Sequence, residues 1–88
     1  MTLQTVVQVL ASIDGVRADR IRPDAHLIDD IGLDSFQFVD VTVALERALN
    51  VERFPMQEWV DDSKALSRPL TVQSLVHACE ALLLKRAS

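Results

Sequence analysis

The sequence predicts an all-α protein, a small four-helix bundle of three long helices and one short one, with a long loop between the first two. Three observations support this fold class. Apolar residues recur at the three-and-four spacing of a helical face in the stretches 3–13, 36–49 and 72–83. No stretch alternates apolar and polar residues between hairpin turns. Only two glycines and three prolines interrupt the 88 residues, so long stretches are free to form helix.

The first helix is expected to start at Thr2, a capping residue, and to stop at Gly15. A connection over residues 16–34 follows, in which the helical period is lost and Pro23-Asp24 marks a turn. A loop of this length in a small domain is uncommon and is often functional. Its candidate anchors in the core are the apolar residues Ile21, Leu27, Ile31 and Leu33.

The second helix is expected to run from Ser35 or Phe36 to about Leu49 and to end near Asn50. At about 100° per residue, it has two apolar stripes on nearly opposite sides. One comprises Phe38, Val41, Leu45, Ala48 and Leu49, and the other comprises Phe36, Val39 and Val43. Because a helix in a small bundle buries one broad face, the second stripe should be partly exposed to a partner, or else packed under the 16–34 loop.

The remaining chain predicts a short helix over residues 56–60, with Met56, Trp59 and Val60 turned inward, and then a polar loop over 61–69. Thr71 is expected to cap a final helix. The apolar positions of that helix keep the three-and-four spacing throughout and are Val72, Leu75, Val76, Cys79, Leu82 and Leu83.

Length and composition indicate one globular domain over residues 1–88, which we expect to be a monomer. The net charge of −4 and the pI near 4.9 argue against nucleic-acid binding and favour basic partners. Twelve of the thirteen acidic residues lie between Asp14 and Asp62, which indicates either a docking surface or simply a solvated face.

The single cysteine, Cys79, excludes an internal disulfide and suits a reducing compartment. No signal peptide or membrane-spanning run is visible, so we expect a cytoplasmic protein. No metal site is predicted, because His26 has no second ligand at metal-binding spacing and His77 lies opposite the apolar stripe of its helix.

The most informative stretch is the acidic loop that opens onto the second helix. Ser35 stands where the helix should begin, and an isolated Asp34-Ser35 pair would be only a helix cap. However, the run Leu27-x-Asp29-Asp30-Ile31-Gly32-Leu33-Asp34-Ser35-Phe36 resembles the acyl carrier protein family, including peptidyl and aryl carrier domains. That family places a large apolar residue, usually leucine, after its aspartate-serine pair, and Phe36 departs from it. The resemblance continues through Ala44-Leu45-Glu46, Phe54-Pro55 and Leu70-Thr71-Val72-Gln73-Ser74-Leu75.

The resemblance implies that Ser35 receives a 4′-phosphopantetheine arm from coenzyme A. The chain would carry acyl intermediates on it as thioesters, in fatty-acid, polyketide, nonribosomal-peptide or related biosynthesis. Asp34 and Gly32 would belong to the same site, Asp34 as cap and enzyme contact and Gly32 by allowing close approach. No residue of the chain suggests a base for Ser35, so the protein would be a carrier and a substrate of partner enzymes rather than an enzyme.

The resemblance also places a partner surface on the second helix. The partners would be a phosphopantetheinyl transferase, an acyl-loading ligase or synthase, and downstream acyl-processing enzymes. Asp40 and Glu46 match acidic contact positions, whereas Gln37 and Arg47 stand where acidic residues are common, so the surface should be less negative than usual. Phe36, Val39 and Val43 would supply the apolar contacts. The stretch Met56–Arg68 looks longer than in typical members, and it could cover the end of the bundle or bias partner choice.

Two other functions are also compatible with the sequence. A helical adaptor could use the same stripe of the second helix without any arm. A small hydrolase built on Ser35 is the weakest alternative, because a serine nucleophile needs an orienting base and only His26 and His77 exist.

Overall fold

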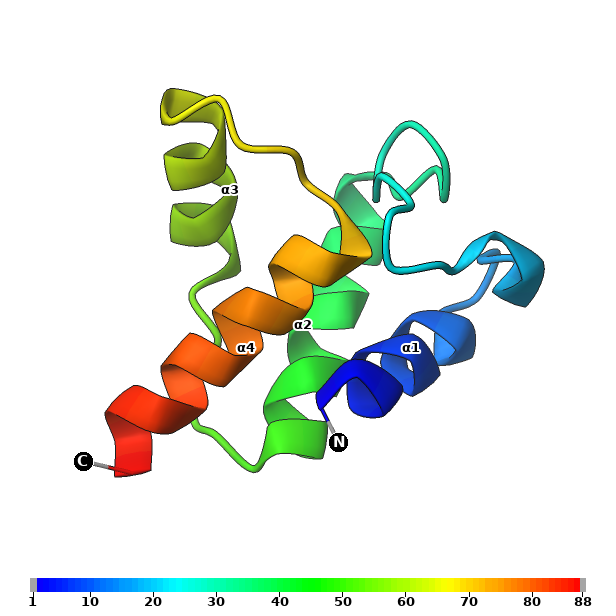
Figure 1. The fold of residues 1–88 in the computed structure, drawn as a ribbon. Helices are drawn as coiled ribbons and strands as arrows, with labels where there is room; N and C mark the ends of the chain where they lie inside the picture. Colours follow the sequence, from blue (N-terminus) through cyan, green and yellow to red (C-terminus); the bar gives the residue numbers. More distant parts are fainter. Residues whose placement is uncertain (1, 88) are drawn as a thin grey trace.

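The computed structural model describes residues 2–87, and the side chains of residues 2–86. It contains four α-helices and one 3₁₀ turn in the order α1, η1, α2, α3, α4 (Figure 1). Their bounds are α1 Thr2–Ser12, η1 Ala18–Arg20, α2 Ser35–Leu49, α3 Met56–Ala65 and α4 Val72–Ala87. Over the described residues there is no strand beyond one antiparallel bridge between His26 and Thr71. The all-α prediction is confirmed.

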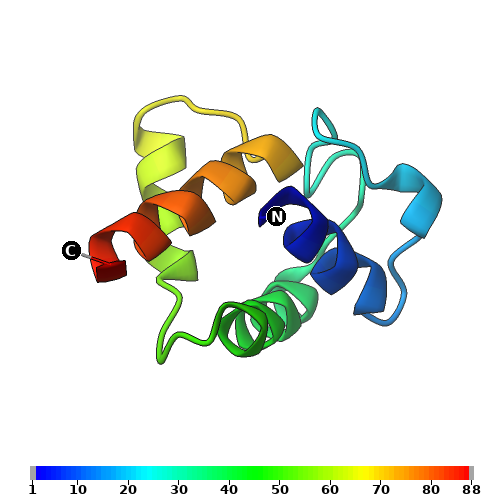
Figure 2. The ribbon, with the colours of Figure 1, turned by 60° about the horizontal axis from the view of Figure 1, so that its bottom comes forward.

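Helix α1 packs against both α2 and α4, and the core lies between these three helices (Figure 2). Their three-and-four spacing puts several apolar side chains of each helix on one side, where burial removes them from water. The fully buried side chains are Val6, Leu10, Leu27, Val41, Leu45, Val72, Leu75 and Cys79. Helix α3 stands to one side of this group (Figure 1).

The long connection between α1 and α2 is ordered by backbone hydrogen bonds to the segment before α4. Leu27 N–H donates to the carbonyl of Leu70 at 2.8 Å, and Val72 N–H donates to the carbonyl of Ala25 at 3.0 Å. The predicted anchors Leu27 and Leu33 are buried, and Ile21 and Ile31 are half-buried against the core. These contacts fix the approach to α2.

Three details differ from the sequence-based expectation. Helix α3 continues to Ala65, although residues 61–69 were expected to form a loop. Ala48 is exposed, and Ala44 packs against the core instead. The long connection contains the unexpected turn η1, which buries none of its residues.

The start of α4 is as expected. Thr71 Oγ1 accepts a hydrogen bond from Ser74 N–H at 3.1 Å, and Ser74 Oγ accepts one from Thr71 N–H at 3.0 Å. These reciprocal bonds satisfy two N–H groups that would otherwise lack partners. No helix within residues 2–87 is both long enough and apolar enough to cross a bilayer.

Candidate functional site

The N-terminus of α2 is closed by Asp34, which is the N-cap residue, and not by Ser35. Asp34 Oδ1 accepts a hydrogen bond from Gln37 N–H at 2.8 Å, and Gln37 Oε1 accepts one from Asp34 N–H at 2.9 Å. This reciprocal pair is a capping box. Ser35 is therefore the first helical residue; it is exposed, and its hydroxyl has no hydrogen-bond partner among residues 2–87. The hydroxyl remains available for chemistry.

The loop that leads to Ser35 is organised by His26. The ring Nδ1 of His26 accepts hydrogen bonds from the N–H groups of Ile28 and Asp29, each at 3.1 Å. The carboxylate of Asp30 accepts one from His26 N–H at 2.7 Å. His26 is half-buried, and its hydrogen bonds hold the acidic loop together.

Gly32 has a φ of +83° in this loop, a conformation that residues with a side chain rarely adopt. A Cβ added there would meet nothing within 4 Å, so its backbone geometry, and not crowding, requires a glycine. The open space beside Gly32 is compatible with the expectation that a partner enzyme approaches the backbone closely here.

An exposed apolar stripe, formed by Phe36, Val39 and Val43, runs along α2 from the residue after Ser35. These side chains are 84%, 61% and 43% exposed, respectively. The alternative that Phe36 and Val39 pack under the preceding loop is therefore wrong. Asp40, predicted to contact partners, is exposed on the same helix. Stripe and carboxylate together form a surface suited to another protein.

The other three predicted contact residues of α2 differ in their surroundings. Arg47 is exposed near the end of the helix. Glu46 is half-buried, and its carboxylate accepts a hydrogen bond from Phe54 N–H at 2.8 Å. Gln37 is also half-buried, and its Nε2 donates to the carbonyl of Asp14 at 3.1 Å. Glu46 and Gln37 thus make internal hydrogen bonds that the sequence did not reveal.

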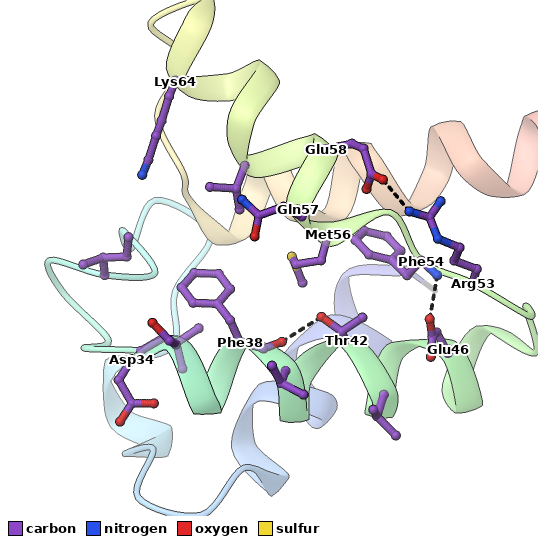
Figure 3. Close-up of a pocket in the computed structure, with 16 residues that line it drawn as sticks. Asp34, Phe38, Thr42, Glu46, Arg53, Phe54, Met56, Gln57, Glu58 and Lys64 are labelled. Atoms are coloured by element: carbon purple, nitrogen blue, oxygen red, sulfur yellow. Dashed lines mark hydrogen bonds and ion pairs between the residues drawn. The ribbon is translucent and has the colours of Figure 1, made fainter.

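A groove of about 770 Å³ lies between α2 and α3, and Ser35 is one of its lining residues (Figure 3). Phe38 from α2 and Met56 from α3 point into it. The full set of apolar lining residues is Ile28, Leu33, Phe38, Val39, Val43, Phe54, Met56 and Val60. The sequence missed the groove, because no local pattern tells how far α3 stands from α2.

Charged groups mark the far end of the groove from Asp34 (Figure 3). Arg53 forms an ion pair with Glu58 there. A hydrogen bond from its own backbone N–H, assisted by the one from Arg53, holds the pKa of Glu58 below its usual value. Both side chains are largely exposed, so this pair is expected to stabilise the fold little.

Cys79 belongs to the core and lies outside this site. Its burial, with a smaller contribution from Glu80, raises the pKa of the thiol to about 12. Among residues 2–87 no group of three histidine, cysteine, aspartate or glutamate side chains could hold a metal ion.

The described residues form a helical scaffold that displays the unpartnered hydroxyl of Ser35 beside an apolar groove and an exposed stripe. The sequence model of a family described as "Phosphopantetheine attachment site" matches residues 4–58. The chain belongs to this family, and its members' cofactor is 4′-phosphopantetheine.

Curated relatives agree with this membership. The chain is 31% identical over 61 residues to a protein of Brucella melitensis named "Acyl carrier protein AcpXL", covering 69% of this chain and 64% of that one. It is 33% identical over 67 residues to the AcpXL of Mesorhizobium japonicum, covering 73% of this chain and 71% of the relative. It is also 40% identical over 47 residues to a protein of Syntrophobacter fumaroxidans named "Acyl carrier protein", covering 53% of this chain and 58% of that protein. The match thus spans somewhat less than two thirds of the Brucella relative.

Proposed function

We propose that Ser35 receives the 4′-phosphopantetheine arm of coenzyme A, and that the chain carries acyl groups to partner enzymes. The observation that supports this most is the exposed, unpartnered hydroxyl of Ser35 at the start of α2. Asp34 is the N-cap residue of α2, and Ser35 is the first residue of the helix. The hydroxyl of Ser35 therefore has no capping role among the described residues. When attached, the arm supplies a thiol that holds acyl groups as thioesters.

The surroundings of Ser35 fit a phosphodiester. A negative group at a helix N-terminus lies close to backbone N–H groups and to the positive end of the helix dipole. In the transfer, Ser35 Oγ forms a bond to the phosphorus next to the pantetheine, and the pyrophosphate bond of coenzyme A breaks. The 3′-phosphorylated adenosine monophosphate leaves, and the hydroxyl proton goes to a base.

That base belongs to the transferase, because the chain's own histidines are engaged elsewhere. His26 Nδ1 already accepts two backbone N–H groups. His77 Nε2 lies 2.9 Å from Gln73 Nε2 on α4. A serine without a base close by is a weak nucleophile, so activation has to come from outside the chain. This is the chemistry of a substrate and not of an enzyme.

The α2 stripe of Phe36, Val39 and Val43, with Asp40 beside it, is the surface that meets partner enzymes. Exposed apolar side chains next to a carboxylate suit a partner with an apolar patch rimmed by basic residues. The partners are a phosphopantetheinyl transferase, an acyl-loading ligase or synthase, and enzymes of fatty-acid, polyketide or related biosynthesis. The chain acts as a cytoplasmic monomer.

The groove between α2 and α3 is the place for the acyl chain. Asp34 and Ser35 both line it, with Asp34 at the end away from Arg53, while Phe38 and Met56 point into it and provide apolar surface. An acyl chain moved from water onto these side chains is stabilised by about 25 cal/mol for each Å² of apolar surface buried.

Incubation with coenzyme A and a broad-specificity transferase, followed by intact mass measurement, tests the proposal. One added arm is expected for the wild type and for Ser12→Ala, a control serine at the end of α1 whose hydroxyl donates to the carbonyl of Val9. No addition is expected for Ser35→Ala. A wild-type chain that stays unmodified would favour an adaptor without an arm.

A further inference from the structure

Gln37 uses both ends of its side-chain amide inside the protein. Its Oε1 accepts the N–H of Asp34 at 2.9 Å, and its Nε2 donates to the carbonyl of Asp14 at 3.1 Å. The first bond belongs to the cap of α2, whereas the second joins two segments 23 residues apart. One side chain therefore connects the start of α2 with the turn that follows α1.

The turn after α1 is shaped to admit this amide. Gly15 has a φ of +88°, and a Cβ built on it would lie 3.1 Å from Gln37 Nε2. Such a contact is tighter than ordinary packing, so the absence of a side chain at residue 15 gives the amide room to reach the neighbouring carbonyl. We call the hydrogen bond from Gln37 Nε2 to the carbonyl of Asp14 the clamp. It depends on two separate features, the glycine at residue 15 and the amide of Gln37.

We propose that Gln37 is a positioning residue for the modification of Ser35, which rests on the proposed function. Ser35 lies between the two residues of the capping box, Asp34 and Gln37. The bond to Asp14 fixes this first turn relative to α1, and so fixes the direction in which the hydroxyl is presented to a docked transferase. In proximity catalysis small errors in the placement of a reacting group lower the rate.

Gln37→Glu separates the clamp from the cap. Glutamate is an ordinary partner in a capping box, because its carboxylate accepts the N–H of residue 34 as the amide oxygen does. It has no donor, however, and it brings a negative oxygen toward the carbonyl of Asp14. If Gln37 were only a surface contact, the added charge would favour a basic transferase and speed the reaction. The positioning role predicts instead that Gln37→Glu slows the reaction.

The test is steady-state transfer from coenzyme A to the wild type, to Gln37→Glu and to the control Gln4→Glu. Gln4 is exposed on α1, and its replacement makes the same change in net charge. Because the chain is the substrate, a loss of folded molecules or of docking affinity raises its apparent KM. A misplaced hydroxyl in the docked complex instead lowers kcat.

We expect Gln37→Glu to lower kcat about fivefold, the rate equivalent of one neutral hydrogen bond, with KM unchanged. Gln4→Glu should behave as the wild type. A denaturation curve of each variant gives its folded fraction at the assay temperature. Unchanged or increased kcat in Gln37→Glu, or a change confined to KM, would overturn the positioning role. A wild type that accepts no arm would instead overturn the proposed function.

Discussion

The capping aspartate of α2 offers a quantitative test of the site's geometry. Asp34→Ala removes the oxygen that lies 2.8 Å from Gln37 N, while Gln37 Oε1 can still accept the N–H of residue 34. One of the two capping bonds is thus lost, which should lower the free energy of unfolding by about 1 kcal/mol. Loss of a negative charge at the positive end of the helix dipole adds roughly 0.3–1 kcal/mol.

Asp34→Asn is the matched variant, because asparagine caps about as well as aspartate but has no charge. It should retain most of the capping contribution. A loss of 1 kcal/mol in the free energy of unfolding lowers the midpoint of thermal unfolding of a domain of this size by roughly 4–8 °C. Asp34→Ala should therefore unfold at a clearly lower temperature than Asp34→Asn. Urea denaturation and thermal unfolding of the three apo chains measure this order.

Equal stability of Asp34→Ala and the wild type would refute the assignment of Asp34 as cap. The same three chains also separate capping from partner contact. If the carboxylate meets a basic transferase as well, Asp34→Asn should be modified more slowly than the wild type while remaining nearly as stable.

Three further predictions follow from other parts of the structure. Asp40→Lys should weaken binding to a basic transferase more at low salt than at high salt, because ions screen exposed charges, and an unchanged affinity at low salt would mean that the apolar stripe docks alone. Glu46→Lys should weaken the same binding and also destabilise the fold, since the carboxylate of Glu46 accepts the N–H of Phe54. Burial raises the pKa of Cys79 from 9.0 to about 12, so the native thiol should resist a disulfide reagent near pH 8, and rapid labelling of the native protein would contradict this. The native state also keeps a proton that the unfolded chain loses, so urea curves should show a contribution of Cys79 to stability that is present below pH 9 and falls between about pH 9 and 12. His26→Ala leaves two backbone N–H groups of the acidic loop without an acceptor, so their hydrogen exchange should accelerate and stability should fall by about 1 kcal/mol, whereas unchanged exchange would show that the loop holds itself together.

The sequence predicted the helices that have a strong apolar period and failed where burial does not follow a local pattern. Helices α1, α2 and α4 each repeat apolar residues over three or more turns, so their existence and inward faces could be read directly. The second half of α3 reads Asp61-Asp62-Ser63-Lys64, and it lacks that period. It is helical although only Ser63 among these four residues is buried.

The exposed stripe of the candidate site could be predicted from helical angles, and its exposure is confirmed. Ser35 was singled out instead by the resemblance of the run around it to the acyl carrier protein family. The sequence also allows Asp34 to be chosen over Ser35 as cap, because Asp34-x-x-Gln37 has the spacing of a capping box. It does not allow the bond from Gln37 to Asp14 to be predicted, since this bond joins segments 23 residues apart. The groove also depends on tertiary packing and could not be predicted from a local pattern.

The most direct measurement is peptide mapping of the chain after treatment with coenzyme A and a transferase. Fragment masses should place one arm on the peptide that contains residues 34–36 and, within it, on Ser35. An arm found on any other residue, or a chain that no competent transferase modifies, would contradict the account.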